Sequence, residues 1–227
     1  MDVDLDLELK TAEPDLWLST RFISDAEKRA DVVALYAFDH TLSRIAHIVT
    51  QPMLGEIRLA WWREAIDEAF DAKPPRAHPV VKALSVAISR RDLNKQAFDT
   101  LIDARERDLD ATPLNLDEAV RYAEQTASDV MSIAARIINP KSASDLIAPG
   151  RAWGVARLAA ERRLTPDAQA AAPQVVRKAL ASTPDMLSEA FPAIAYAALA
   201  RDFAAGRTPS DFSKRMRLFW AVARGKL

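Results

Sequence analysis

The chain has 227 residues, enough for one domain or at most two small ones. Hydrophobic residues make up 49% and charged residues 28%, which excludes a disordered chain, because such a chain would lack the apolar surface for a core. The net charge of −1 gives no overall basic field, so we expect no nucleic-acid partner, and the absence of cysteine excludes disulfides and thiolate metal sites. The 43 alanines and only 5 glycines favour helices over sheets.

The N-terminal segment, residues 1–14, is predicted to be a flexible, solvated leader that ends at Pro14. It begins with the acidic stretch MDVDLDLELK, whereas signal and transit peptides are basic in this region. No apolar run in the chain reaches the roughly 18 residues of a membrane-spanning helix. We therefore expect a cytoplasmic protein, and peripheral contact with the inner membrane stays open.

The first long helix is predicted from about residue 24 to residue 49. Ser24 is the expected N-cap, with Glu27 completing a capping box. Apolar residues then recur at helical spacing and predict a buried face, made of Leu35, Phe38, Leu42, Ile45 and Val49.

Further helices are predicted along the rest of the chain, separated by proline-containing breaks. One of them should begin at an N-cap formed by Asn115 or Asp117, another could begin only at Gly150, and the Ala-, Gln- and Pro-rich stretch 164–173 is predicted to be a loop. The pattern indicates a single all-α domain over residues 15–227. The predicted helices span about 55–70, 78–90, 94–109, 116–138, 144–163, 184–205 and 210–223.

A second stripe on the first long helix is polar. Tyr36, His40, Ser43 and His47 fall within a sector of roughly 60°, about 150° from the apolar stripe. One interpretation is a solvated face, and the other is a helix with one face in the core and one lining a polar cavity. A zinc site would need a third ligand, and since His78 is the only other histidine, we expect no metal.

The charged cluster 103–110 also has two interpretations. Asp103 and Arg107 are spaced as an i,i+4 ion pair, which is typical of a solvated, salt-bridged face. Asp103 and Asp108 diverge by about 140° on a regular helix, so they could not hold one ion together. The alternative is that this segment forms the wall of a polar cavity.

Two further stretches combine aromatic residues with cations. In Trp61-Trp62-Arg63, we expect one indole in the core and one at its rim, with Arg63 paired to a carboxylate; a binding surface is the alternative. The C-terminal stretch 214–226 is basic, contains no acidic residue and carries Phe219 and Trp220. It is interpreted as a solvated helix or as a contact for an anionic membrane or a protein partner.

Several blocks resemble the squalene/phytoene synthase family. The resemblance is carried by LYAF at 35–38, GEIRLAWWR at 55–63, HPV at 78–80, LIDARERDL at 101–109 and YAEQT at 122–126. It covers residues 15–160 well and implies an all-helical isoprenoid-synthase fold around a central cavity.

The resemblance also implies chemistry that this chain is not equipped for. Active members of the family join two prenyl diphosphates and hold Mg²⁺ on two Asp-rich motifs, because that hard ion bridges carboxylates and diphosphate oxygens. The aspartate positions of the first motif correspond here to Ser43, Arg44 and His47. His40 stands where the family usually has an arginine, and Asp39 is out of phase with the motif.

The second motif is equally poor in ligands. Its positions correspond to Gly154, Arg157, Glu161 and Thr165, of which only Glu161 could bind a metal. We therefore expect no cofactor, with Mg²⁺ relevant only if the protein is an enzyme after all. Two or more acidic side chains brought together inside the cavity would contradict this interpretation.

The pattern is closer to a divergent branch of the family, which includes the mitochondrial factor needed to assemble respiratory complex I. Asp103, Arg105 and Glu106 match that branch. The leading hypothesis is a non-catalytic, chaperone-like assembly factor that binds a respiratory-complex subunit. Two alternatives stay open: a prenyltransferase with a non-standard site, or a carrier that binds an isoprenoid. The cavity-lining candidates are Tyr36, His40, Ser43, Arg44, His47, Asp103, Arg157 and Glu161.

Overall fold

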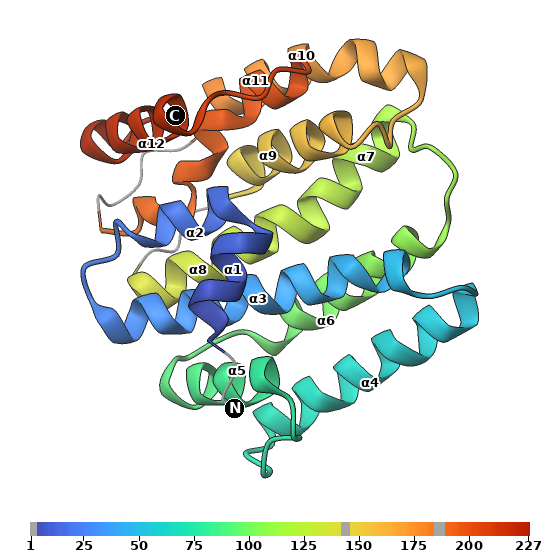
Figure 1. The fold of residues 1–227 in the computed structure, drawn as a ribbon, viewed down its shortest axis with the longest axis vertical. Helices are drawn as coiled ribbons and strands as arrows, with labels where there is room; N and C mark the ends of the chain where they lie inside the picture. Colours follow the sequence, from blue (N-terminus) through green and yellow to red (C-terminus); the bar gives the residue numbers. More distant parts are fainter. Residues whose placement is uncertain (1–3, 142–145, 184–188) are drawn as a thin grey trace.

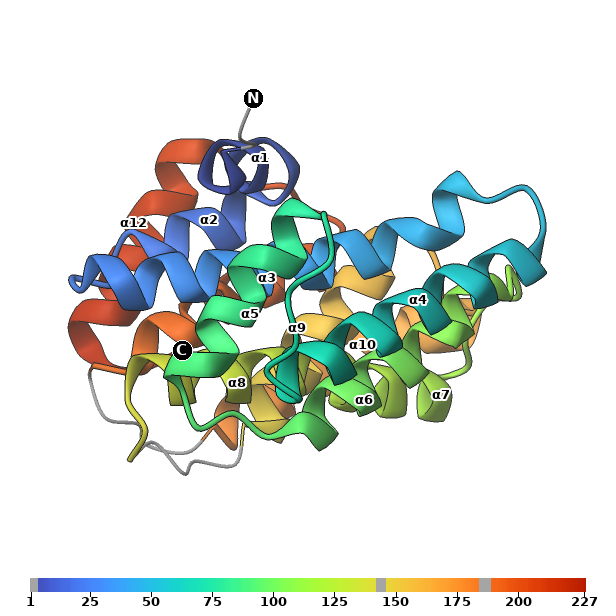
Figure 2. The same cartoon turned by 90° about the horizontal axis from the view of Figure 1, so that it is seen from below.

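The computed structural model describes residues 4–141, 146–183 and 189–227. Over these residues the chain is all-α, as predicted, and the only β contact is an isolated bridge between Leu114 and Leu164 (Figures 1 and 2). The α-helices are α1 (Leu5–Ala12), α2 (Pro14–Thr20), α3 (Ala26–Ile48), α4 (Pro52–Phe70), α5 (Pro79–Arg90), α6 (Lys95–Ala104), α7 (Leu116–Ala123), α8 (Asp129–Ile138), α9 (Ile147–Ala160), α10 (Pro166–Ala181), α11 (Ala200–Ala204) and α12 (Asp211–Arg224).

Helix α3 runs through the middle of the molecule (Figure 1). It packs against α4 and α5 on one side and against α8 and α1 on others, while α9 packs on α7, α10 and α11. The predicted apolar stripe is buried as expected at Leu35, Phe38, Leu42 and Ile45. The N-cap is Asp25 and not Ser24, because the Asp25 carboxylate accepts the backbone N–H groups of residues 27 and 28.

The segment predicted as a solvated leader is instead folded. Asp4 caps α1, and Leu9 in that helix is buried in the core. Eight residues are too few to be stable as an isolated helix in water, so packing on α3 stabilises α1. Sequence periodicity alone was a weak guide here because the apolar positions are few and alternate with acids.

Two predicted helices change their pitch partway. The helix expected over 94–109 is α-helical only to Ala104 and continues as a 3₁₀ segment, Arg105–Leu109. The helix expected over 116–138 begins at Asn115, one of the two predicted N-caps, which forms a capping box with Glu118, but a π-helical turn, Glu124–Ser128, separates α7 from α8. Each change rotates the side chains that follow it relative to a regular helix.

The stretch 164–173 was predicted to be a loop. In the structure, residues 166–173 form the first half of α10. Thr165 caps this helix, Pro166 occupies its first turn, and a stripe of small residues including Ala168 and Ala172 is buried against the core. Alanine's high helix propensity and this stripe outweigh the single internal proline, Pro173.

The predicted helix 184–205 is also wrong as a continuous element. Residues 184–188 lie outside the described part of the chain, and the remainder forms two 3₁₀ segments, Phe191–Ala193 and Ala195–Leu199, before α11. For the predicted helix 144–163, residues 144 and 145 also lie outside, and α9 starts at Ile147. Among the described residues, no helix combines the length and apolar composition needed to cross a bilayer.

Candidate functional site

A cavity of about 520 Å³ lies between α3 and α9. The α1–α2 junction, the 3₁₀ segment after α6, α7 and the π-helical turn complete its wall. Apolar groups such as Leu16, Val130 and Trp153 line it beside ten side chains that carry a carboxylate, a guanidinium or an imidazole. The latter are Glu13, Asp39, His40, Arg44, His47, Arg105, Asp108, Arg157, Glu161 and Arg163.

The polar stripe of α3 supplies one wall of this cavity. His40, Ser43, Arg44 and His47 line it, so this face of the helix is polar because it borders the cavity. Tyr36, which we expected beside them, does not line it: its ring is fully buried and meets Tyr196 edge to face at 5.9 Å. One turn of helix therefore separates a core residue from a cavity residue on the same stripe.

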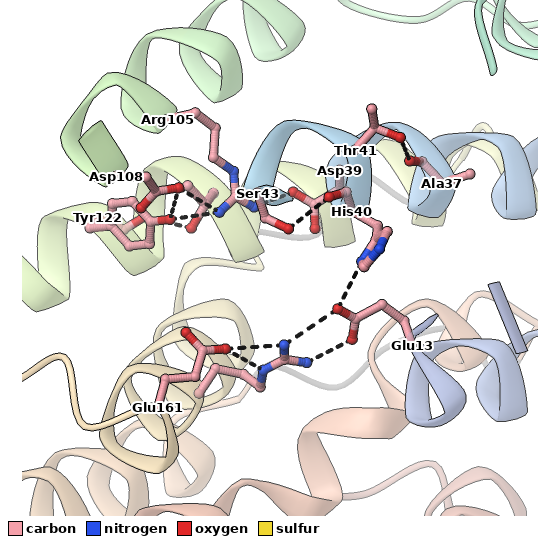
Figure 3. A network of polar contacts seen from close by, with 12 residues as sticks. Glu13, Ala37, Asp39, His40, Thr41, Ser43, Arg105, Asp108, Tyr122 and Glu161 are labelled. Carbon is pink, nitrogen blue, oxygen red and sulfur yellow. Dashed lines mark hydrogen bonds and ion pairs between the residues drawn. The ribbon is translucent and has the colours of Figure 1, made fainter. Parts of the chain in front are cut away.

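Arg157 on α9 is the centre of the first polar cluster, which we call the Arg157 cluster (Glu13, His40, Arg157 and Glu161; Figure 3). The guanidinium of Arg157 lies 2.8 Å from Glu13 and 3.1 Å from Glu161. The Nδ1 atom of His40 lies 3.2 Å from the other oxygen of Glu13. Glu13 sits between α1 and α2, so this cluster ties the N-terminal helices to both walls of the cavity.

The environment of Glu13 favours its ionised form. Burial alone raises the pKa of this carboxyl, but the hydrogen bond with His40 and the charge of Arg157 outweigh burial and lower the pKa to about 2. Burial alone would likewise lower the pKa of Arg157, and the charge of Glu13 raises it above its usual value instead. Glu13 and Arg157 therefore form a charged pair at neutral pH.

Arg105 is the centre of the second cluster, which we call the Arg105 cluster (Asp39, Arg105, Asp108, Tyr122 and Arg163). Figure 3 shows Asp39, Arg105, Asp108 and Tyr122 of this cluster. Its guanidinium hydrogen-bonds to Asp39 and lies 2.6 Å from the Tyr122 hydroxyl and 3.3 Å from Asp108. The Tyr122 hydroxyl donates to Asp108 at 2.9 Å, and Arg163 binds the other oxygen of Asp108 at 2.7 Å. Burial raises the pKa of Tyr122 to about 12, so its hydroxyl remains a donor at neutral pH.

Local geometry explains this second cluster. The shift from α-helix to 3₁₀ helix after Ala104 changes the angle between successive side chains, so Arg105 and Asp108 both reach the cavity. On the opposite wall, Gly154 lies so close to α7 that a Cβ there would be 2.5 Å from the Cβ of Ala123. This close approach of α9 and α7 brings Arg163 and Tyr122 together.

Asp103 lies outside the cavity, contrary to the expectation for this residue. Its carboxylate pairs with Arg63 on α4, and the side chain is exposed. The predicted ion pair with Arg107 is also wrong, because the 3₁₀ segment rotates Arg107 toward Asp110 and Thr112. The pairing of Arg63 confirms the first interpretation of the Trp61-Trp62-Arg63 stretch, in which Trp62 is buried and Trp61 lies at the rim.

The cavity retains acidic side chains, which overturns the sequence argument that the chain lacks metal ligands and removes that argument's support for a non-catalytic protein. Glu13, Asp39, Asp108 and Glu161 all line it. Sequence reasoning missed Glu13, which was assigned to the leader, and Asp39, which lies out of phase with the motif. Arg105 and Asp108 confirm the alternative interpretation of the 103–110 cluster, in which that segment forms a wall of a polar cavity. Tyr122 and Arg163 were not proposed as cavity residues, although the 122–126 block contains Tyr122.

These carboxylates do not fit a magnesium ion. Each of the four is bound by an arginine, and four arginines against four carboxylates leave the cavity wall without excess negative charge. Across the described ranges, no group of three or more His, Asp or Glu side chains is placed to hold a metal. His78 is distant from the cavity wall and packs edge to face on Trp62 at 5.0 Å.

Comparisons with known proteins give a family, curated relatives and solved structures with the same fold. The family model for squalene/phytoene synthase matches residues 9–161. Complex I assembly factor 6 from Bos taurus is 32% identical over 117 residues, which is 51% of this chain and 35% of the bovine protein. The Drosophila melanogaster homologue of that factor is 30% identical over 142 residues, covering 58% of this chain and 42% of the fly protein. The chain therefore matches less than half the length of these curated relatives.

Solved structures share the fold at low sequence identity. A dehydrosqualene synthase in complex with a ligand superimposes with a TM-score of 0.72 at 12% identity, covering 97% of this chain and 94% of that one. A squalene synthase from Alicyclobacillus acidocaldarius gives a TM-score of 0.59 at 17% identity, with the same coverage. At these identities the similarity concerns the isoprenoid-synthase fold alone.

Proposed function

Since this chain belongs to the squalene/phytoene synthase family, we propose that it is a non-catalytic member of that family that acts as an assembly factor for respiratory complex I. The assembly role is transferred from the name of its curated relatives, which it matches over part of their length. The absence of catalysis is inferred from the cavity. The partner is then a respiratory-complex subunit.

The observation that carries the non-catalytic proposal is the pairing of each cavity carboxylate with arginine. Magnesium-dependent ionisation of a prenyl diphosphate needs carboxylates free to bind the ion. Here Arg157 binds Glu13 and Glu161, and Arg105 binds Asp39 and Asp108. A cation would have to displace a guanidinium from each pair and leave that guanidinium without its partner.

A second candidate function follows from the same cavity. Arg44 on the cavity wall has no carboxylate partner among the described residues, and the cavity also has apolar lining groups such as Trp153 and Val130, which suits a ligand with an anionic head and a hydrocarbon body. An isoprenoid carrier would use the cavity in this way without chemistry. A prenyltransferase would in addition need Arg44, His47, Arg157 and Glu161 to act on a diphosphate without the metal ligands of the family.

Two experiments test the proposal. Deletion of the gene should reduce assembled NADH:quinone oxidoreductase, seen on native gels, and expression of the wild-type chain should restore it; normal assembly in the deletion strain would contradict the assembly role. Purified protein incubated with farnesyl or geranylgeranyl diphosphate, Mg²⁺ and NADPH should form no C30 or C40 hydrocarbon. Turnover that is lost on Glu161→Ala would establish the enzyme instead, and binding of the diphosphate without turnover would support the carrier.

A further inference from the structure

Helix α12 carries an apolar face that points away from the molecule. Four large side chains on it, Phe212, Met216, Phe219 and Trp220, are 37% to 75% exposed. At about 100° per residue they occupy roughly 100° of the helix circumference, so they form one continuous face. Helix α12 lies at the edge of the molecule in both views (Figures 1 and 2).

Contacts on the opposite side of α12 fix this orientation. Leu218 and Ala221 are buried, and the helix packs on the 3₁₀ segment Ala195–Leu199 and on α2. Lys214 binds Asp15 on α2 at 2.9 Å, and Arg217 binds Asp202. Two ion pairs and a buried apolar stripe therefore hold α12 with its aromatic face outward.

Cations border the apolar face on both sides. By helical position Arg215 lies on one flank and Arg224 on the other, and Lys226 follows the helix. Among the residues that the structure describes, Arg215, Arg224 and Lys226 have no carboxylate partner, and the guanidinium of Arg224 lies 5.0 Å from the Trp220 ring centroid. The acidic residue of this helix, Asp211, lies by helical position toward its packed side.

We propose that α12 docks this protein on an anionic phospholipid surface, lying in the plane of the interface. An exposed face of aromatic and apolar residues with a free cation on each flank matches the chemistry of that surface, in which acyl chains lie below negatively charged headgroups. Arg215 and Arg224 then contact the headgroups while Phe219 and Trp220 insert below them. The charge complementarity favours a lipid surface over an uncharged protein groove.

A second exposed apolar group provides a matched control. Met53, Leu54 and Ile57 at the start of α4 are exposed to a similar degree, but Glu56 lies among them and they include no aromatic ring. Non-specific hydrophobic adsorption to vesicles would involve both groups of side chains, whereas the proposal assigns lipid binding to α12 alone.

The test is co-sedimentation of the full chain with vesicles of phosphatidylcholine alone or with 30% phosphatidylglycerol, on the order of the anionic content at which surface potentials attract basic segments. We expect binding only to the anionic vesicles, weakened by raising the salt concentration, because exposed charges are screened. Arg215→Ala with Arg224→Ala should weaken binding about tenfold or more, and Phe219→Ser with Trp220→Ser should abolish it.

The control pair Met53→Ser with Ile57→Ser should bind like the wild type. Because all of these side chains are exposed, circular dichroism should show each variant folded. Equal binding to neutral vesicles, no binding at low salt, or an equal loss in the control pair would overturn the proposal. If the α12 variants bind vesicles normally but fail to restore complex I assembly, α12 is a protein contact and the lipid proposal is wrong.

Discussion

The two arginine clusters of the cavity have the same design and different surroundings. In each, one guanidinium joins two carboxylates from different parts of the chain. The side chain of Arg105 is 9% exposed, and that of its partner Asp108 is 6% exposed, whereas Arg157 is 34% exposed. The Arg105 cluster is therefore buried in the protein interior, while the Arg157 cluster lies partly exposed where the N-terminal helices α1 and α2 meet the cavity.

This difference in burial predicts which substitutions in the cavity wall destabilise the protein most. A buried charge that loses its partner cannot be solvated, so substitutions in the Arg105 cluster should be strongly destabilising. The Arg157 cluster borders solvent and joins Glu13 between two short helices to α9, so we expect its loss to cost less stability than loss of the Arg105 cluster.

Arg105→Met should have the largest effect on stability. It leaves Asp39 without its guanidinium and Asp108 with Arg163 only, so we expect a loss of about 3–5 kcal/mol in the free energy of unfolding, measured in urea. Arg105→Met combined with Asp39→Asn removes both charges and should recover part of that loss. A loss below about 1 kcal/mol for the single variant would mean that the cluster is solvated.

Glu13→Gln tests the Arg157 cluster through its pH dependence. The pKa of Glu13 is lowered from 4.5 to about 2, so the ionised form stabilises the fold above pH 4.5 and this contribution is lost as the pH falls toward 2. The variant should be less stable than the wild type by up to about 3 kcal/mol at pH 7, and about 1.4 kcal/mol of that gap should close by pH 3.5. A gap that does not change with pH would contradict the assigned pairing.

Asp129 at the start of α8 has no arginine partner among the residues that the structure describes. Burial raises its pKa from 3.8 to about 6, so ionisation destabilises the fold as the pH rises through this range. Asp129→Asn should therefore stabilise the protein by about 1–2 kcal/mol at pH 8 and very little at pH 4. Thermal unfolding at the two pH values measures this, and a destabilised variant at pH 8 would show that the ionised carboxylate has a favourable partner.

Asp103→Asn should have the smallest effect. Its ion pair with Arg63 is exposed, and such pairs contribute less than about 1 kcal/mol. The variant should also leave complex I assembly unchanged in the complementation assay, because Asp103 lies outside the cavity. A strong assembly defect would indicate that this surface contacts the partner.

Many of the helices were predictable because their positions follow from local sequence patterns. The apolar stripe of α3, an N-cap at Asn115 or Asp117 and the helix at 210–223 are read from residues a few positions apart, and the structure confirms the stripe, the cap at Asn115 and the helix. The errors in the helices have one cause. Short or proline-containing segments such as α1 and α10 owe their structure to packing on neighbours, which a local pattern cannot report.

The candidate site was predictable only in part. The spacing of His40, Ser43 and His47 indicated a polar face on α3, and the resemblance pointed to Arg157 and Glu161. Asp39 and Asp108 could not be placed, because their partners depend on changes of helical pitch that have no clear signal in the sequence.

The sequence by itself determined that the chain is helical, which face of α3 is buried, and which family it resembles, because periodicity, capping and motif spacing are local properties. Only the tertiary structure decided which charges meet. Glu13 and Arg157 are 144 residues apart, and Arg105 reaches Asp39 across 66 residues. Such pairings depend on how helices cross and where their pitch changes, so the neutralised cavity that supports the proposed function arises from packing.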